Sequence, residues 1–387
     1  MTEVVRPPEP GGPRHPPLAA TTRLAGPDVT RAIALIGVVV MNFHGYLNGG
    51  DDHVDRSFAE RVFDPADGPL STRFAATFVL VAGIGVTLLT NRSRLSEDHL
   101  AVRDDRWRLA RRGLLLFVVG LLVEWIWRGT ILFFYGAYFM VSALLFTLRA
   151  RWLVLVGSVA ALGGAGISWF RITRTLDGHD MGWLDPDVTS PRNLFLRTFV
   201  GYTHPLLPWL TFVCAGILLG RILSNLHEYR TRLIGAGIVL FAGTYLINFV
   251  GLRWATNDFT VDDRSARLWR GMLSTGPFDR GPLYTINTLG SSIVAYCAIS
   301  WLAERFADAR PMQLFRHAGQ MTLTLYVLHV ITFNAVVNWW RWVTPTGLDT
   351  ALVFSLVFWV LAIVVGAMWH RFAGTGPLER IYRNFGG

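Results

Sequence analysis

Asn42 and His53 are the two side chains in this sequence whose types and spacing best fit catalysis. Asn42 lies in an apolar run, and His53 follows eleven positions later in an acidic loop. An imidazole that titrates near neutral pH can take a proton from a hydroxyl or an amine, and an amide can donate to the oxyanion on a thioester carbon. Because polar groups are costly in apolar surroundings unless they face a cavity or a partner, we interpret the pair as a candidate functional site.

The composition predicts the class of protein that must position this pair. Of the 387 residues, 52% are hydrophobic and only 16% are charged, which is typical of an integral membrane protein. Both cysteines, Cys214 and Cys297, lie in apolar runs, so we interpret them as small core residues rather than as a disulfide. The expected fold is an all-α, polytopic membrane protein.

Ten apolar runs are long enough to be transmembrane helices, since a span needs roughly 20 residues or somewhat fewer. We expect them at Ala32–Leu47, Phe74–Thr90, Gly113–Trp127, Ile131–Leu148, Trp152–Phe170, Leu206–Leu223, Leu233–Leu252, Leu283–Leu302, Met321–Trp342 and Ala351–Trp369. The third run is short, so it forms either a tight helical hairpin with the fourth or a re-entrant unit.

The distribution of arginine predicts the orientation in the membrane. All 36 basic residues are Arg, and the loop 91–112 alone holds seven of them. Cytoplasmic loops carry the excess of basic residues, so we expect both termini in the cytoplasm and His53 on the outside. The positive charge is thus accounted for by topology, which disfavours nucleic-acid binding.

The chain divides into a tail and one membrane domain. Residues 1–28 are rich in Pro and Gly and lack an apolar run, so we expect a disordered cytoplasmic tail. Residues 29–387 form the transmembrane domain, with long external loops at Asn48–Pro69 and Arg171–Thr203.

Several short motifs occur in a recognisable order. They are Arg31-Ala32-Ile33-Ala34-Leu35, the spacing from Asn42 to His53, Arg73-Phe74 before Gly83-Ile84-Gly85, Arg111-Arg112-Gly113, Pro208-Trp209-Leu210 before Gly216 and Gly220-Arg221, Gly319-Gln320-Met321-Thr322-Leu323-Thr324-Leu325-Tyr326, and Gly376-Pro377-Leu378-Glu379. In this order the chain resembles the transmembrane acyltransferases of the heparan-α-glucosaminide N-acetyltransferase type and their bacterial relatives.

The resemblance implies a reaction across the membrane. In that family an acetyl group passes from cytosolic acetyl-CoA to an amine or hydroxyl on the far side, with a His and an Asn at the site, which match His53 and Asn42. The stretch between them is acidic here and carries an additional His44, which departs from the family pattern. The acceptor is therefore open between a sugar and a glycolipid, and transfer can be direct or can pass through an acyl-histidine.

Coenzyme A carries phosphates that arginine forks recognise, especially beside a helix N-terminus. Arg111 and Arg112 begin the expected third helix, so we expect them to bind the acyl-CoA donor, with Arg106 and Arg108 in reserve. No metal is expected.

The candidate catalytic residues also have structural interpretations. His53 beside Asp51 and Asp52 can be a solvated loop residue, and Asn42 can hydrogen-bond a neighbouring helix. His44, two residues from Asn42, is expected to point away from that face.

A polar stripe in the ninth span has two interpretations as well. Tyr326 and His329 share one face of this span, and Asn334 and Asn338 continue it. The stripe either lines an acyl tunnel or packs against other helices, and helix packing is the favoured interpretation.

The expected function is transfer of an acetyl or other short acyl group from cytosolic acyl-CoA to an extracytoplasmic acceptor, in the plasma membrane. The alternative is a transporter or flippase for a lipid-linked or small-molecule substrate. Apart from Glu124, which we expect to pair with Arg128, no carboxylate lies in an expected span, so ion-coupled transport is disfavoured. The expected partners are the lipid bilayer, the acyl donor and the acceptor; a homo-oligomer is compatible with the sequence.

Overall fold

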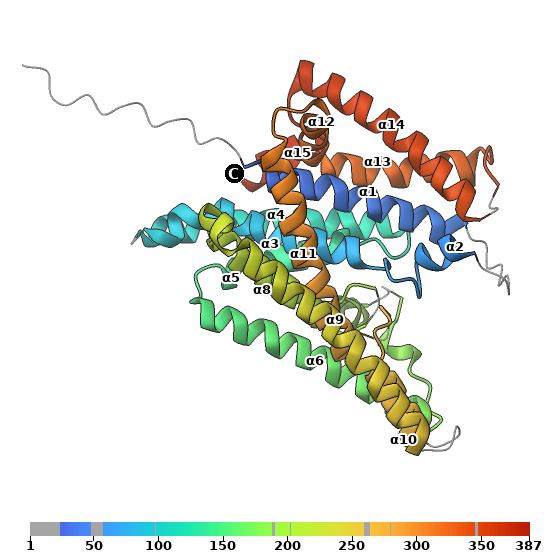
Figure 1. Cartoon of the computed structure of the whole chain (residues 1–387). Helices are drawn as coiled ribbons and strands as arrows, with labels where there is room; N and C mark the ends of the chain where they lie inside the picture. The colour runs from blue at the N-terminus through green and yellow to red at the C-terminus, as the bar shows by residue number, and fades with distance from the viewer. Residues whose placement is uncertain are drawn as a thin grey trace, which may run out of the picture.

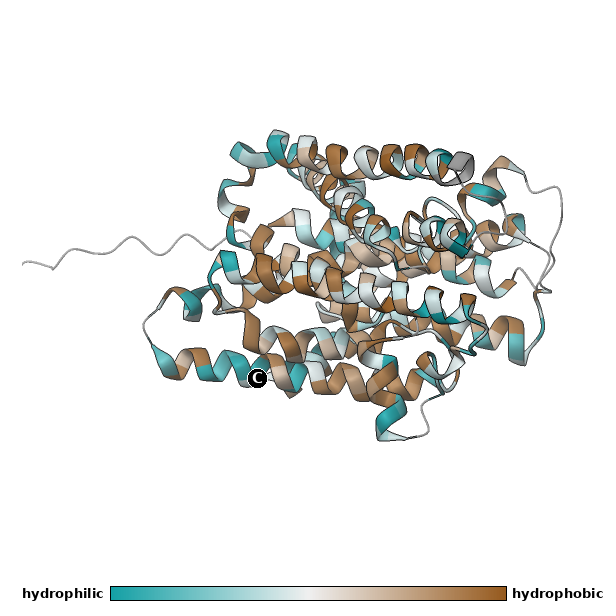
Figure 2. Cartoon of the chain, turned by 90° about the horizontal axis from the view of Figure 1, so that it is seen from below, coloured by the Kyte–Doolittle hydropathy of each residue, from teal (hydrophilic) through white to brown (hydrophobic). Residues whose placement is uncertain are grey.

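The computed structural model shows a bundle of long helices (Figure 1). It describes residues 24–47, 57–96, 98–187, 190–201, 203–258, 264–278, 280–344 and 347–387, and among these there is no β-strand. Hydrophobic residues occupy most of the length of the long helices, and hydrophilic residues gather toward helix ends and connecting segments (Figure 2). The chain is thus an all-α, polytopic membrane protein, as the composition predicts.

The helices follow one another in this order: α1 Ala25–Leu47, α2 Phe58–Val62, α3 Arg73–Leu95, α4 His99–Glu124, α5 Leu132–Leu145, α6 Ala150–Leu176, η1 Gly182–Leu184, α7 Pro191–Phe199, α8 Leu206–Arg221, η2 Leu223–Asn225, α9 Leu226–Asp258, α10 Arg264–Met272, α11 Pro282–Arg305, α12 Arg310–Gly319, α13 Thr322–Phe333, η3 Asn334–Trp339, α14 Leu348–Ala373 and α15 Pro377–Gly386.

Within the described residues, seven helical segments are long and apolar enough to cross a membrane. They are Ala25–Leu47, Arg73–Leu95, Ala150–Leu176, Leu223–Trp254, Pro282–Arg305, Thr322–Trp339 and Leu348–Ala373. The shorter apolar helices α5 and α8 coincide with two further expected spans, and the second half of α4 coincides with the remaining one. Each expected span is therefore helical, whereas the number of ten crossings and the cytoplasmic termini stay predictions.

Two expected boundaries differ in the structure. Helix α1 begins at Ala25, so residues 25–28, which we assigned to the tail, form its first turn, and Asp28 is buried there. Helix α4 begins at His99, where the side chain of Asp98 accepts hydrogen bonds from two backbone amides. Arg111 and Arg112 therefore lie inside this helix and not at its start, because the cap and the polar first turns extend the helix well before the apolar run.

Glycines let several helix pairs approach closely. A Cβ atom on Gly216 of α8 would lie 2.0 Å from the carbonyl oxygen of Leu80 on α3, and one on Gly83 would lie 2.4 Å from the carbonyl oxygen of Val213. In the α4–α5 hairpin, a Cβ on Gly136 would lie 2.4 Å from the amide nitrogen of Phe117. Small residues at such contacts are how membrane helices pack, because no water is expelled between them.

Polar contacts tie the C-terminal helices to the start of the bundle. Gln320 donates to the Asp28 carboxylate at 3.1 Å, and a Cβ on Gly319 would lie 1.8 Å from the Asp28 carbonyl oxygen. The carboxylate of Glu379, on α15, accepts from the amides of Leu323 at 2.6 Å and Thr324 at 3.1 Å. Glu379 thus caps the N-terminus of α13, where a negative charge is stabilised by the free amides.

The α3–α8 contact provides a test of this packing. Gly216→Ala should destabilise the folded protein by about 1–3 kcal/mol, because the added methyl group overpacks a contact between two backbones. Thermal unfolding of the purified protein in detergent measures the loss. Gly235→Ala is the matched control, since nothing lies within 4 Å of the position of its Cβ. Equal melting temperatures for the two variants would contradict this account.

Candidate functional site

Two cavities enter the bundle from opposite ends of α1. The first, the arginine cavity, has a volume of about 250 Å³ and includes Arg31, Arg112 and Arg383. Its remaining lining is mostly apolar or aromatic and comprises Phe78, Ala82, Gly85, Leu89, Leu116, Ile131, Leu132, Tyr135, Phe139, Gly319, Gln320, Thr322, Leu323, Tyr326, Glu379 and Tyr382. A basic mouth followed by an apolar interior suits an anionic ligand with a long uncharged arm.

The basic residues of the arginine cavity come from three distant segments. Arg31 lies on α1, and a Cβ on Gly85 of α3 would be only 2.7 Å from its guanidinium, so this glycine makes room for it. Arg112 lies over the ring of Tyr382 at 5.1 Å, and its Nε has no hydrogen-bond partner among the described residues. Burial raises the pKa of Tyr382 to about 12, so its hydroxyl stays protonated. Arg112 thus keeps a buried, unpaired N–H donor beside Gly386 of α15.

Only one of the four arginines expected at the donor site lines this cavity. Arg112 does so, whereas Arg108 pairs with Asp105 at 2.9 Å and Arg106 donates to Thr147 at 3.3 Å. Arg111 is exposed and is not part of the lining. The sequence placed a helix N-terminus beside these residues, whereas α4 begins at His99, so donor binding by Arg111, Arg106 and Arg108 stays a prediction.

Arg31 and Arg383, which do line the cavity, received no binding role from the sequence. Arg31 stood in the motif that opens the first helix. Its position in an apolar run beside Asp28 could have indicated a binding role. It pairs with that carboxylate at 3.4 Å. For Arg383, on an amphipathic C-terminal helix, the sequence offered no comparable sign.

The second cavity, the asparagine cavity, has a volume of about 300 Å³ and contains Asn42. Its lining also comprises Val38, Met41, Gly45, Tyr46, Pro65, Thr72, Phe74, Ala75, Trp127, Arg128, Gly129, Ile131, Thr203, His204, Phe278 and Tyr326. His204, from the segment that precedes α8, is the imidazole that the structure describes in this lining. Burial and then the charge of Arg280 lower its pKa to about 3, so it is neutral at physiological pH.

Asn42 is held by a histidine from α13. Its Nδ2 lies 3.1 Å from Nε2 of His329, which is fully buried. Nδ1 of His329 contacts the carbonyl oxygen of Tyr326, which can only accept, so Nδ1 carries the proton and Nε2 accepts from Asn42. The contact fixes the amide and leaves its second N–H and its carbonyl oxygen to the asparagine cavity.

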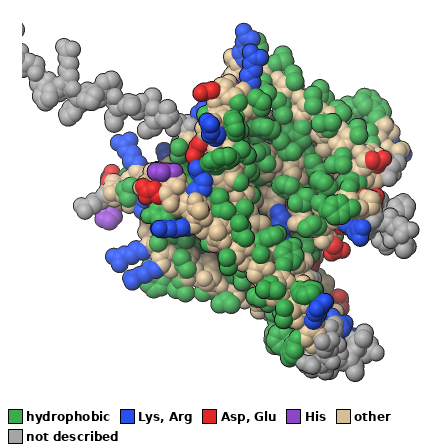
Figure 3. Space-filling model, viewed as in Figure 1, with side chains coloured by type: hydrophobic (Ala, Val, Ile, Leu, Met, Phe, Trp, Pro, Cys, Tyr) green, Lys and Arg blue, Asp and Glu red, His purple; other side chains and the backbone are tan. Residues whose placement is uncertain are grey.

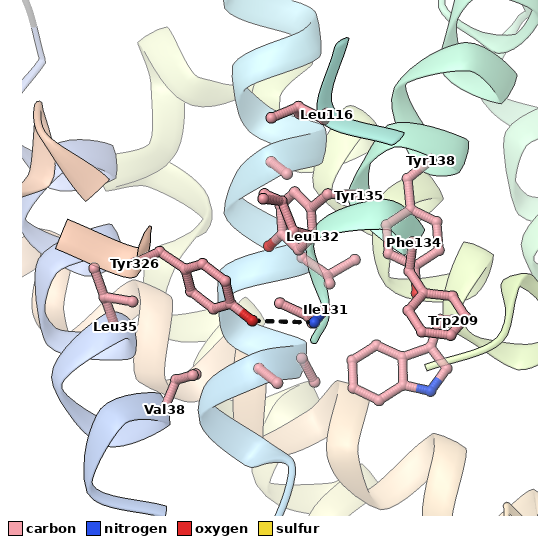
Figure 4. Close-up of a cluster of buried hydrophobic side chains, with 14 of the residues drawn as sticks. Leu35, Val38, Leu116, Ile131, Leu132, Phe134, Tyr135, Tyr138, Trp209 and Tyr326 are labelled. Carbon is pink, nitrogen blue, oxygen red and sulfur yellow. Dashed lines mark hydrogen bonds between the residues drawn. The ribbon is translucent and has the colours of Figure 1, made fainter. Parts of the chain in front are cut away.

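Tyr326 and Ile131 line both cavities and form the wall between them (Figure 4). The backbone amide of Ile131 donates to the Tyr326 hydroxyl at 3.2 Å, and this hydroxyl also lies 2.9 Å from Oγ1 of Thr130. In the polar stripe on α13, Tyr326 faces the cavities and His329 packs against Asn42. Helix packing is thus found for His329, and an acyl tunnel stays a prediction.

His53 lies outside the described residues, together with Asp51, Asp52 and Asp55. His44 is buried and its Nδ1 lies 2.6 Å from the carbonyl oxygen of Phe63, away from the asparagine cavity. In the described part of the chain, no group of three or more His, Cys, Asp or Glu side chains is placed to hold a metal ion.

Glu124 has a different partner from the one expected. Its carboxylate pairs with Arg197 of α7, and both side chains are buried. Arg128, four residues on, lines the asparagine cavity. The expectation from helical spacing was wrong because α4 ends at Glu124, so the next residues leave the helix.

Comparisons with known proteins cover nearly all the described residues. A family model for the catalytic domain of heparan-α-glucosaminide N-acetyltransferase matches residues 23–244. A second model, for a family of unknown function called DUF418, matches residues 221–386. No curated protein matches the chain. The arginine cavity and the Asn42–His329 contact each join residues from both matched regions.

Proposed function

Since the chain belongs to the family of the heparan-α-glucosaminide N-acetyltransferase catalytic domain, and is therefore a membrane acyltransferase in general terms, we propose a specific reaction for it. It transfers an acetyl or other short acyl group from cytosolic acyl-CoA to a hydroxyl or amine of an extracytoplasmic sugar or glycolipid, in the plasma membrane. The observation that carries this proposal is the pair of cavities that approach from opposite ends and share the wall of Tyr326 and Ile131.

The arginine cavity is the proposed donor site. It lies at the same end of α1 as Asp28 and the C-terminal helix α15, the end that arginine distribution assigns to the cytoplasm. Arg31, Arg112 and Arg383 supply guanidinium groups for the phosphates of coenzyme A, because planar forks bind phosphate oxygens in pairs. The apolar interior accommodates the pantetheine arm and directs the thioester toward Tyr326.

The asparagine cavity is the proposed acceptor site. Here the acceptor oxygen or nitrogen attacks the thioester carbon and gives its proton to a base, the C–S bond breaks, and the coenzyme A thiolate leaves and takes up a proton. His53 is the base or the nucleophile by family resemblance, and Asn42 donates its free N–H to the developing oxyanion. His329 is a positioning residue, because it acts through Asn42.

Donor binding should depend on the arginines that line the cavity. Arg112→Gln and Arg31→Gln should each weaken binding of acetyl-CoA by about 10- to 100-fold, because a hydrogen bond to a charged group contributes about 1.5–3 kcal/mol. Calorimetry with acetyl-CoA and a non-thioester analogue measures this. Arg106→Gln, which removes an exposed arginine outside the cavity, is the control. If folded wild-type protein binds no acyl-CoA, the chain is better explained as a transporter or flippase.

Substitution of Asn42 or His53 should reduce turnover much more than it reduces the affinity for the acyl donor. Asn42→Ala should reduce kcat by about 10²–10³, the usual cost of losing an oxyanion donor, and His53→Ala should abolish most turnover. Donor affinity should stay near that of the wild type, since both residues act mainly on the transition state. Single-turnover assays with radiolabelled acetyl-CoA separate the two effects. Near-normal turnover in the His53→Ala protein would overturn its assignment and make His204 the next residue to test.

The wall between the cavities should keep water from the thioester. Tyr326→Phe removes the hydroxyl that bonds Ile131 and lies against Thr130, so hydrolysis of acetyl-CoA without acceptor should rise several-fold at unchanged donor affinity. Release of free thiol measures hydrolysis. Tyr296→Phe is the matched control, because Tyr296 is fully buried and lines neither cavity. Hydrolysis at the wild-type rate in the Tyr326 variant would show that the hydroxyl does not hold the wall closed.

A further inference from the structure

A third cavity, the Arg280 cavity, lies beside the asparagine cavity and has a volume of about 180 Å³. It is bounded by α6, by the start of α8 and by the segment that precedes α11. Phe278 lines both this cavity and the asparagine cavity, so the two adjoin. Two arginines, Arg171 and Arg280, face the Arg280 cavity from different segments of the chain. No part of the proposed reaction described so far uses it.

The two arginines share one carboxylate. Arg171 donates to both carboxylate oxygens of Asp185, from Nη1 to Oδ2 at 2.9 Å and from Nη2 to Oδ1 at 3.4 Å. Arg280 lies farther from the same carboxylate, with Nη1 3.9 Å from Oδ1. Because Asp185 already makes a bidentate pair with Arg171, it compensates only part of the charge of Arg280. This cluster of three ionised side chains therefore carries a net positive charge.

The surroundings of Arg280 make the burial of its positive charge energetically unfavourable. Only 9% of the residue is exposed, and its Nε has no hydrogen-bond partner among the described residues. Burial, followed by the nearby charge of Arg171, lowers its pKa to about 10, so it is still protonated at neutral pH. A buried cation with an unused donor is costly unless an anion completes its surroundings.

The charge of Arg280 also reaches the acceptor site. Arg280 contributes to the lowered pKa of His204, whose side chain lines the asparagine cavity. Because Phe278 lines both cavities, a ligand in the asparagine cavity can extend past it and present a second group to Arg280. The geometry favours a ligand with its nucleophile at one end and a negative charge at the other.

We propose that Arg280, assisted by Arg171, binds an anionic group of the acyl acceptor while the acceptor's hydroxyl or amine lies in the asparagine cavity beside Asn42. The group is a carboxylate, phosphate or sulfate, which an arginine fork recognises through paired hydrogen bonds. It belongs either to a water-soluble sugar acid or sugar phosphate or to a lipid headgroup. This assignment rests on the proposed function, because it identifies the class of acceptor for that same reaction.

The test is anion binding to the full chain in neutral detergent, with coenzyme A present at saturation to occupy the arginine cavity. Glucuronate and glucose 6-phosphate are titrated by calorimetry, and glucose is the neutral counterpart. We expect both anions, and not glucose, to bind the wild type, and Arg280→Gln to weaken binding at least 10-fold. Arg264→Gln is the matched control, since this arginine at the start of α10 pairs with Asp177 at 2.8 Å and lines none of the three cavities.

A second variant keeps the proposal testable if Arg280→Gln fails to fold. Asp185→Asn removes the competing carboxylate, so anion binding should tighten several-fold. To separate lipid from soluble anions, the wild type is also titrated in nanodiscs of phosphatidylcholine and of phosphatidylglycerol. If glucuronate binds more weakly in phosphatidylglycerol nanodiscs than in phosphatidylcholine nanodiscs, a lipid headgroup is the natural occupant of the site. If glucuronate binds equally in the two kinds of nanodisc, the acceptor is a soluble molecule.

Three results would overturn the anion site: no binding of either anion to the wild type, undiminished binding to Arg280→Gln, or unchanged affinity in Asp185→Asn. Repeating the titration in the Arg112→Gln background excludes the arginine cavity as the source of the heat. Failure of the proposed function appears separately, as an absence of coenzyme A binding or of acyl transfer. Anion binding without acyl transfer would remove the acceptor assignment.

Discussion

The capping of α13 by Glu379 is the interaction on which the arrangement of the site depends. The carboxylate binds the amides of Leu323 and Thr324, and its second oxygen accepts from the Thr324 hydroxyl at 2.5 Å. Helix α13 carries both Tyr326 and His329, so its placement sets the wall between the cavities and the support of Asn42. The side-chain carboxylate of Glu379 therefore fixes the positions of both residues, and Glu379 also lines the arginine cavity.

The molecule has an apolar surface suited to the bilayer, and it also buries a set of polar side chains within its largely apolar interior. Figure 3 shows hydrophobic side chains spread over the visible face, with arginines grouped toward its edges. In the interior, polar side chains are paired across helices, as Gln320 is with Asp28 and Asn42 with His329. Such pairs are needed where no water can replace them, and they also hold helices from the two ends of the chain together.

Hydrophobic run lengths predicted the fold well, because the spans depend on local composition: every expected span coincides with a helix. The site was less predictable, because its geometry depends on contacts between distant segments. Asn42 was recognisable as a polar residue in an apolar run, but its partner His329 lies 287 positions away. Arg111 was placed at a helix start because a polar helical extension has no apolar signature, and Arg383 is brought to the arginine cavity by a tertiary contact that no local pattern records. His53 stays a prediction.

The thin wall between the cavities has an electrical consequence. Where water fills both cavities, the insulating path between the two aqueous phases shrinks to the side chains of Tyr326 and Ile131, and the membrane voltage falls mainly there. In the proposed reaction the sulfur keeps the electron pair of the C–S bond, so the acyl group crosses this path as the equivalent of an acyl cation. The thiolate takes up a proton on the inside, and the acceptor releases a proton on the outside. Each turnover therefore moves one positive charge outward, against about 2.3 kcal/mol for every 100 mV of inside-negative potential. The thioester would thus supply the energy for acyl transfer against the membrane potential.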